Sequence, residues 1–402
     1  MVQILAPVGS FAALKASIQS GADAIYFGVG QLQMRSKTAS FQREDMSKIC
    51  QICHDAQVKA YLVVNTIVFD QEQEEIHQLL MHAKKTGVDA IIAHDFAVIQ
   101  KARAFKLPIH ISTQANITNI ESVKFYAQFA DCVVLARELT LSQIAYICER
   151  IKKEHILGVS GKLLQVEIFV HGALCVAFSG KCYMSLHTQN SSANRGHCYQ
   201  TCRKAYTLSD ENQAYIQVDN PYILSPKDLC TIPILDRIVE SGVTLLKIEG
   251  RGKSPEYVKT TVSVYKRAIE HIREKTYSED VKEKLINELQ TVYNRDFWMN
   301  GYYLGEPIAQ WSKKVNSQAT EKKVFSGKVI DYFAQKQIAH IKIQSSKVQK
   351  GDEIYVIGPT TGVIRQRIDE IQNHPENEIT TPFSTKVRKN DEVYLIEKVS
   401  TK

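Results

Sequence analysis

Four cysteines in the middle of the chain have the residue type and spacing needed to hold a metal centre. They run from Cys175 through Cys182 and Cys198 to Cys202, separated by six, fifteen and three residues. Thiolates are the soft ligands that iron and zinc prefer, and four of them complete a tetrahedral ion site or hold one cubane cluster. Structural zinc sites usually use tighter cysteine pairs. The looser spacing therefore favours a 4Fe-4S cluster, with zinc as the alternative.

The other five of the nine cysteines are scattered along the chain. Cys50 and Cys53 lie three residues apart in a helical pattern, where both would pack into the core. Cys230 stays open as a substitute for one of the four ligands. If the segment from Cys198 to Cys202 is helical, these two residues share one face and both sulfurs reach the same centre.

The elements that must position these cysteines are short apolar runs that alternate with helix-like patterns. Strands are expected at residues 3–6, 24–28, 60–65, 90–93, 109–113, 133–136, 166–170 and 245–249. Helical spacing follows, for example at 11–20, 71–85, 142–152, 257–273 and 281–293. Eight such strands predict a (β/α)8 TIM-like barrel of the α/β class, with a doubly wound open sheet as the alternative. No strand is followed by GxGxxG, which weakens a dinucleotide-binding interpretation.

Polar residues follow the ends of several of these strands. They are Asn65, Asp95, Gln114, Asn116, Arg137, Glu138, His171, Glu249 and Arg251. In a barrel they would open onto one rim, where active sites are built. Arginine suits a carboxylate because its guanidinium forms a bidentate fork. We therefore expect His171, Glu249 and Arg251 to carry the chemistry, with Arg35, Gln114 and Arg137 binding an anionic substrate.

The remaining organisation is a long insertion and a change of pattern near the C-terminus. Residues 175–244 are too long for an ordinary loop and carry the four cysteines, so they read as a functional insertion in a barrel domain spanning 1–311. A polar linker is expected at 312–323. From 324 to 402 apolar and polar residues alternate with period two, which predicts a small antiparallel β-barrel.

Composition sets broad limits on the class of protein. Net charge is +7, which is compatible with an anionic partner such as RNA or a carboxylate. No run approaches the roughly 18 apolar residues needed to span a bilayer, and Pro7 and Gly9 interrupt the first apolar stretch. We expect no membrane partner and a cytoplasmic protein, in which the cysteines stay reduced and available to a metal.

The cysteine segment closely resembles the signature of the collagenase-like peptidase U32 family. The matching residues are Glu167, Phe169, Gly172, Ala173, Leu174, Cys175, Gly180, Cys182, Met184 and Ser185. Further matches are LAPVGSFAALKASIQSGADAIYFG, ANRGHCYQTCRKAY, LKIEGRGKSPEYV and NRDFWMNGYYLG. The resemblance covers nearly the whole chain, and the C-terminal strands look like a small barrel that some members append.

What the resemblance implies is oxygen-independent hydroxylation. The most similar branch hydroxylates the wobble uridine of tRNA to 5-hydroxyuridine, using prephenate. A second branch modifies ribosomal RNA, and a third acts in anaerobic ubiquinone synthesis with one of the four cysteines replaced. The resemblance implies that Cys175, Cys182, Cys198 and Cys202 ligate the cluster, with tRNA or rRNA and a small carboxylate as partners.

Two other classes of function stay open. The family name implies a peptidase, yet the sequence has no HExxH helix and no GxSxG elbow. His171, four residues before Cys175, forms the only suggestive pair of base and nucleophile. A non-enzymatic RNA-binding module with a structural metal is the third interpretation.

Overall fold

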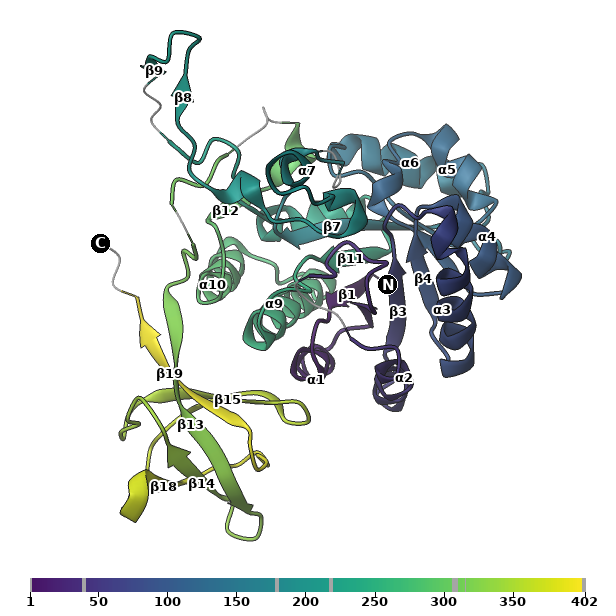
Figure 1. Ribbon diagram of the computed structural model, residues 1–402. Coiled ribbons are helices and arrows are strands. Elements are labelled where there is room, and N and C mark those ends of the chain that lie inside the picture. The colour runs from purple at the N-terminus through teal and green to yellow at the C-terminus, as the bar shows by residue number, and fades with distance from the viewer. Residues whose placement is uncertain are drawn as a thin grey trace.

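Eight parallel strands close into a barrel in the computed structural model, which describes residues 2–37, 41–177, 181–216, 220–305, 310–314 and 316–399 (Figure 1). The strands are β1 (Gln3–Pro7), β2 (Ala24–Gly28), β3 (Lys59–Val64), β4 (Ala90–Ala93), β5 (Ile109–Ile111), β6 (Cys132–Val134), β7 (Gln165–Gly172) and β11 (Leu245–Ile248). Each pairs with the next, and β11 pairs in parallel with both β7 and β1. The predicted TIM-like barrel is confirmed, because this closure excludes an open sheet.

Helices cover the outside of the barrel. They are α1 (Phe11–Gln19), α2 (Asp45–Asp55), α3 (Gln73–Thr86), α4 (Phe96–Ala104), α5 (Ile120–Ala127), α6 (Leu141–Lys153), α8 (Leu235–Glu240) and α9 (Pro255–Arg273), with α10 (Glu279–Gln290) beyond them. Polar side chains cap the N-termini of several of these helices. The Ser10 side chain accepts from the backbone N–H of Ala13, and Thr140 and Gln143 form a capping box.

Strand alternation divides the core into two layers. On β11, Leu246 and Ile248 belong to the large apolar layer between strands and helices, whereas Leu245 belongs to a smaller cluster inside the barrel. Side chains alternate between the two faces of a strand, so Lys247 shares the inner side with Leu245. A fully buried Leu or Ile contributes roughly 1.5–3 kcal/mol, and the outer layer holds dozens of apolar residues.

The insertion between β7 and β11 lies over the carboxyl ends of the barrel strands. It contains α7 (Met184–Gln189), the 3-10 turns η4 (Ala193–Arg195) and η5 (Thr201–Arg203), the hairpin β8 (Leu208–Ser209) and β9 (Tyr215–Ile216), and β10 (Asp228–Cys230). Figure 1 shows the hairpin projecting away from the barrel. Strand β10 returns to pair antiparallel with β7 and parallel with β12 (Phe297–Met299). Gly180 lies outside the described residues.

The C-terminal part is a seven-stranded antiparallel sheet with its own apolar core. Its strands are β13 (Glu321–Phe333), β14 (Ile338–Ile343), β15 (Glu353–Gly358), β16 (Gly362–Arg367), β17 (Gln372–His374), β18 (Glu378–Pro382) and β19 (Glu392–Lys398). The order is β16-β15-β19-β13-β14-β18-β17, and no ladder joins the two outer strands in the described part of the chain. Strand β13 already begins at Glu321, inside the segment expected as a linker.

The C-terminal sheet packs against α1 and α9, on the lower side of the barrel in Figure 1. Ala16 of α1 shares a small buried cluster with Tyr355 and Val363. The Lys259 side chain of α9 donates to the Val363 carbonyl at 2.7 Å. The sheet is therefore attached near the outside of the first and last barrel helices, away from the carboxyl-end rim.

Candidate functional site

A cavity of about 200 Å³ opens at the carboxyl ends of the barrel strands, beneath the insertion. Its wall includes residues that follow β2, β3, β5, β6, β7 and β11 together with residues of the insertion. Of the rim residues expected from sequence, the structure brings to it Asn65, Gln114, Arg137, Glu138, Glu249 and Arg251, and also Arg35. Asp95 caps α4 instead, and Asn116 ends η2 (Thr113–Ala115) in a left-handed conformation.

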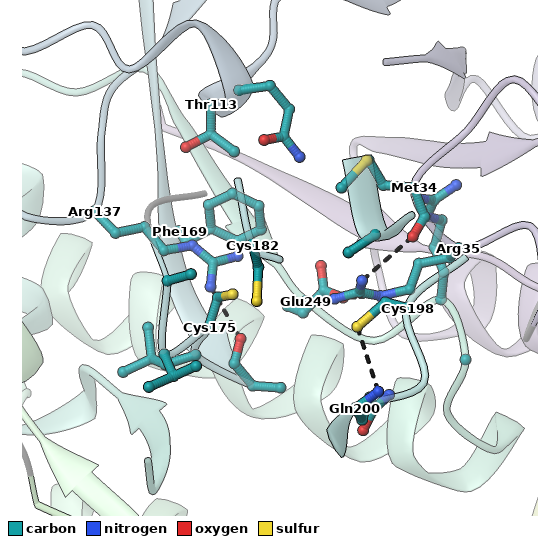
Figure 2. Close-up of a pocket in the computed structure, with 18 of the residues that line it drawn as sticks. Met34, Arg35, Thr113, Arg137, Phe169, Cys175, Cys182, Cys198, Gln200 and Glu249 are labelled. Atoms are coloured by element: carbon teal, nitrogen blue, oxygen red, sulfur yellow. Dashed lines mark hydrogen bonds and ion pairs between the residues drawn. The ribbon is translucent and has the colours of Figure 1, made fainter. Parts of the chain in front are cut away.

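All four clustered cysteines line this cavity. They are Cys175, Cys182, Cys198 and Cys202, termed below the four-cysteine group. Figure 2 shows the side chains of Cys175, Cys182 and Cys198 pointing into the region between Arg137 and Arg35. Burial raises the pKa of the Cys202 thiol, Arg203 opposes this, and the other three cysteines add to the rise. The four sulfurs thus lie within electrostatic reach of one another.

Backbone amides support two of these sulfurs. The N–H of Met184 donates to Cys182 Sγ, and that of Gln200 donates to Cys198 Sγ, each at 3.4 Å. N–H···S hydrogen bonds of this kind stabilise thiolates that bind a metal. The arrangement therefore has both the ligand atoms and the outer hydrogen bonds of a metal centre.

The segment from Cys198 to Cys202 is not the helix that was considered from its spacing. Only η5 is helical, and Gln200 before it adopts a left-handed conformation with φ of +53°. The reversal at Gln200 turns its N–H back onto Cys198, which a continuous helix would not allow. The two cysteines reach the cavity from a loop and a short turn rather than from one helical face.

The four sulfurs are more widely spread than the ligands of a single tetrahedral ion. With Zn–S distances of about 2.3 Å, zinc holds its sulfurs about 3.8 Å apart. Among the described residues, the one group of three or more ligand atoms within 4.8 Å of each other is His110, Cys132 and Glu167, inside the barrel. Among the described residues, no three sulfurs of the four-cysteine group meet this spacing, so the group is not arranged as a ready-made zinc site.

Cys230 takes no part in the four-cysteine group. It is fully buried in β10, opposite His171 of β7, and burial raises the pKa of its thiol to about 12. Cys50 and Cys53 are also buried, on α2, as their helical spacing predicted.

An ion pair between Arg35 and Glu249 stands at the centre of the cavity. Arg35 Nη2 lies 3.2 Å and its Nε 3.3 Å from Glu249 Oε1, and Tyr26 donates to Glu249 Oε2 at 3.4 Å. Burial alone would raise the pKa of the Glu249 carboxyl, but Arg35 and the other cations of the cavity lower it below its ordinary value. Glu249 is therefore a carboxylate that holds Arg35 in place.

Two further arginines line the cavity, Arg251 buried at 4% exposure and Arg137 partly exposed. Arg137 donates to the Ala173 carbonyl at 2.9 Å and stacks on the Phe169 ring at 3.9 Å. Arg251 donates to Gln33 Oε1 at 2.6 Å, and burial lowers its pKa to about 10. The Nε atoms of both are buried without a hydrogen-bond partner in the described part of the chain. Cations held this way favour an anionic ligand.

His171 is not brought to the cavity. It is 2% exposed and lies among the rings of Tyr257, Tyr265 and Phe297, with its Nδ1 3.5 Å from the Tyr265 hydroxyl. Burial lowers the pKa of its imidazole to about 3. The expected grouping of His171 with Glu249 and Arg251 is therefore not what the structure has.

Sequence reasoning missed four cations of the cavity wall: Arg203, Lys247, Lys253 and Arg295. Lys253 stands two residues after Arg251 in the GRGKS segment, which was the available signal. Arg203 directly follows Cys202 in ANRGHCYQTCRKAY, and Arg295 lies inside NRDFWMNGYYLG, so for both the available signal was a segment that matches the family. With them, the lining holds seven cationic side chains and only two carboxylates, Glu138 and Glu249.

A buried charge network forms the floor of the cavity. Lys247 Nζ lies 2.7 Å from Glu167 Oε1, and His110 Nδ1 lies 3.1 Å from Glu167 Oε2. Because Lys247 already neutralises Glu167, the group of His110, Cys132 and Glu167 is better described as an ion-pair network than as a metal site.

Fold and site together define a (β/α)8-barrel protein with a cationic, cysteine-lined cavity at its carboxyl-end rim. The chain belongs to peptidase family U32, whose family model matches residues 9–313. In the described part of the chain, no helix has the length and apolar content to cross a membrane.

Curated relatives carry two kinds of name. A protein of Porphyromonas gingivalis named collagenase is 44% identical over 98% of both chains. The tRNA hydroxylation protein P1 of Bacillus subtilis is 30% identical over 94% of this chain and 88% of its own. The 23S rRNA 5-hydroxycytidine C2501 synthase of Escherichia coli is 34% identical over 68% of this chain and 40% of its own.

Proposed function

We propose that this protein is a tRNA-modifying enzyme that hydroxylates the wobble uridine to 5-hydroxyuridine without molecular oxygen, using a 4Fe-4S cluster and prephenate. The observation that carries the proposal is the convergence of the four-cysteine group and a strongly cationic wall on one barrel cavity. The relatives named for tRNA hydroxylation and for an rRNA synthase support RNA as the substrate class.

The residues present fit a cluster. Four thiols from the insertion face one cavity, and two of their sulfurs accept backbone N–H bonds. Bound there, a cluster would supply electron transfer at the rim of the barrel. Zinc stays the alternative occupant, and metal analysis separates the two.

The other residues of the cavity bind and orient the substrate. Arg137 and Arg251 place guanidinium charges in the cavity wall, where they attract a carboxylate of the co-substrate. Glu249 fixes Arg35 beside them, and its low pKa keeps it ionised at neutral pH, so it positions Arg35 rather than supplying a proton. Gln114, also in the lining, offers an amide that can hydrogen-bond to a polar edge of the substrate.

The experiment compares nucleosides in tRNA from a deletion strain and from strains carrying Cys182→Ser or, as a control, Cys148→Ala on α6. We expect 5-hydroxyuridine derivatives to disappear in the deletion and Cys182→Ser strains and to persist in the control. Anaerobically purified protein should contain about four irons per chain and absorb broadly near 400 nm. Unchanged tRNA would refute the tRNA substrate, and loss of a hydroxylated rRNA nucleoside instead would assign the rRNA reaction.

The 44% identical relative named collagenase makes a peptidase the second candidate. It would need a cysteine nucleophile activated by a base. His171, the base expected from sequence, lies among buried aromatic rings and stays neutral because burial lowers its pKa to about 3. Cleavage of denatured collagen by metal-loaded protein, lost in Cys175→Ala but resistant to chelation, would establish the peptidase. Failure of the loaded protein to cleave would remove it.

A further inference from the structure

Three cations gather on the side of the cavity nearest the insertion. Lys253 follows β11, Arg203 closes η5, and Arg295 lies between α10 and β12. These elements are far apart in the sequence, and each contributes one positive charge to the same wall. We call these residues the Lys253 cluster.

Two members of the Lys253 cluster are fixed by hydrogen bonds. Arg203 donates to the Pro226 carbonyl at 2.6 Å and to Ser225 Oγ at 3.1 Å. Arg295 is 9% exposed and pairs with the buried carboxylate of Asp228 at 3.2 Å. Asp228 is the one carboxylate in contact with the cluster within the described residues, so it balances at most one of the three cationic groups.

Lys253 is the member that lacks an oxygen partner. Its Nζ lies 3.1 Å from the centre of the Tyr293 ring, and it has no hydrogen-bond acceptor or ion-pair partner in the part of the chain that the structure describes. Burial, with the charge of Arg295 second, lowers the pKa of Lys253 to about 7. A lysine in such surroundings is stabilised as a cation when an anion reaches it.

The Lys253 cluster is distinct from the cations around Glu249. The charges that act on the Glu249 carboxyl are those of Arg35, Arg137, Arg251 and Lys247. Those that act most on Lys253 are Arg295 and then Asp228, ahead of Glu249. The cavity therefore has two cationic groups, which suits a ligand, or a pair of ligands, with two separated anionic groups.

We infer that Lys253, Arg203 and Arg295 form a second anion subsite that binds a phosphodiester oxyanion of the RNA. This rests on the proposed function, because a nucleotide whose base enters the cavity brings its own phosphates to the mouth. Lysine binds phosphate as a point charge, and the two fixed arginines add donors in set directions. The cations around Glu249 are then left for the carboxylate co-substrate.

The test measures binding of an unmodified tRNA transcript to anaerobically purified protein at about 50–200 mM salt. The variants are Lys253→Met, the charge-retaining Lys253→Arg, and Lys162→Met as a control. Lys162 is exposed in the loop before β7, at the opposite end of the barrel. Losing one phosphate contact should make the slope of log affinity against log salt shallower by about 0.7–0.9. The wild-type affinity should then fall about threefold more than that of Lys253→Met across this range.

We expect this change in Lys253→Met alone, with prephenate affinity unaltered and Lys253→Arg restoring the slope. An unaltered slope in Lys253→Met overturns the subsite while leaving tRNA binding, and so the proposed function, intact. Weakened prephenate binding with an unaltered slope also overturns it, since the anion would then be the carboxylate. Wild-type protein that binds no tRNA refutes the proposed substrate itself, and the subsite with it.

Discussion

The buried ion pair beneath the cavity should contribute measurably to the stability of the barrel. We consider Glu167→Gln, which keeps the size of the side chain and one acceptor but removes its charge. Glu167 is fully buried and Lys247 is 5% exposed, with 2.7 Å between Nζ and Oε1. Breaking a buried pair by removing one partner costs roughly 3–5 kcal/mol, because the other charge is left uncompensated. Lys247 also lies over the rings of Tyr26 and Phe169. These cation–π contacts still stabilise the Lys247 charge after Glu167 is neutralised, so we expect a loss at the lower end of that range, about 3 kcal/mol.

The assay is urea unfolding of anaerobically purified protein, followed by far-ultraviolet circular dichroism. The matched control is the double variant Glu167→Met with Lys247→Met, which removes both charges and should lose less than about 1 kcal/mol. A loss below about 1 kcal/mol in Glu167→Gln would refute the reasoning. Equal losses in the single and double variants would also refute it, because they would show that volume rather than charge matters.

The pH dependence of the same pair has a definite sign. Burial alone would raise the pKa of Glu167, but Lys247 and His110 outweigh it and lower the pKa to about 2. Because the folded pKa lies below the unfolded value of about 4.3, the stabilisation is fully present above pH 4.3 and is lost as the pH falls towards 2. A carboxyl shifted this far contributes roughly 3 kcal/mol at neutral pH, the same size as the loss expected for Glu167→Gln. The double variant should lack this acid-induced loss.

Two glycine substitutions test the close packing of the site against β11 and of the C-terminal sheet against α1. Gly172→Ala places a Cβ 2.5 Å from the Glu249 carbonyl at a φ of +103°, so we expect a loss of about 1–3 kcal/mol in urea unfolding together with reduced iron content. Gly362→Ala, at a φ of +75°, would push aside the Gln19 side chain, which donates to the Thr361 carbonyl at 3.1 Å, and limited proteolysis should show the C-terminal sheet released sooner from α1. Gly161→Ala, at a φ of +76° with open space around it, controls for backbone strain in both; equal effects there would contradict both expectations.

Much of the barrel could be predicted because buried parallel strands are short apolar runs. All eight expected strands form within a few residues of their predicted bounds, and polar residues after them reach one rim. The C-terminal sheet was predicted from period-two alternation across residues 324–402, but β17 and β18 show this pattern only weakly. These two are short and polar on their exposed faces, as in Gln372–His374, so their pattern resembles a loop.

His171 shows why the site was predicted only in part. With period-two alternation, His171 should face the same side of β7 as Glu167 and Phe169. The pairing with β11 contains a register shift, in which Lys247 pairs with Phe169 but Ile248 pairs with His171. This irregularity places an extra residue on β7, so His171 takes the outer side with Ile248 and meets the α9 tyrosines. Because a bulge depends on the partner strand, the alternation of apolar and polar residues along β7 does not reveal it.

The candidate site exists only where the insertion meets the barrel. Arg195 holds the insertion to Glu72 through two hydrogen bonds, and Gly196 lies so close to the Gln33 carbonyl that a Cβ would be 2.3 Å away. Gln33 in turn accepts from Arg251, so the contact that seats the cysteine segment also orients a cation of the barrel rim.

The same coupling runs through Arg203, which is adjacent to Cys202 in η5 and donates to the carbonyls of Leu174 and Pro226. Leu174 immediately precedes Cys175, so one guanidinium ties the two ends of the four-cysteine group together. Anything that orders the cysteines also orders Arg203, which is one member of the Lys253 cluster. Metal loading and anion binding should therefore rise and fall together, and anion affinities are meaningful only for protein whose metal content has been measured alongside.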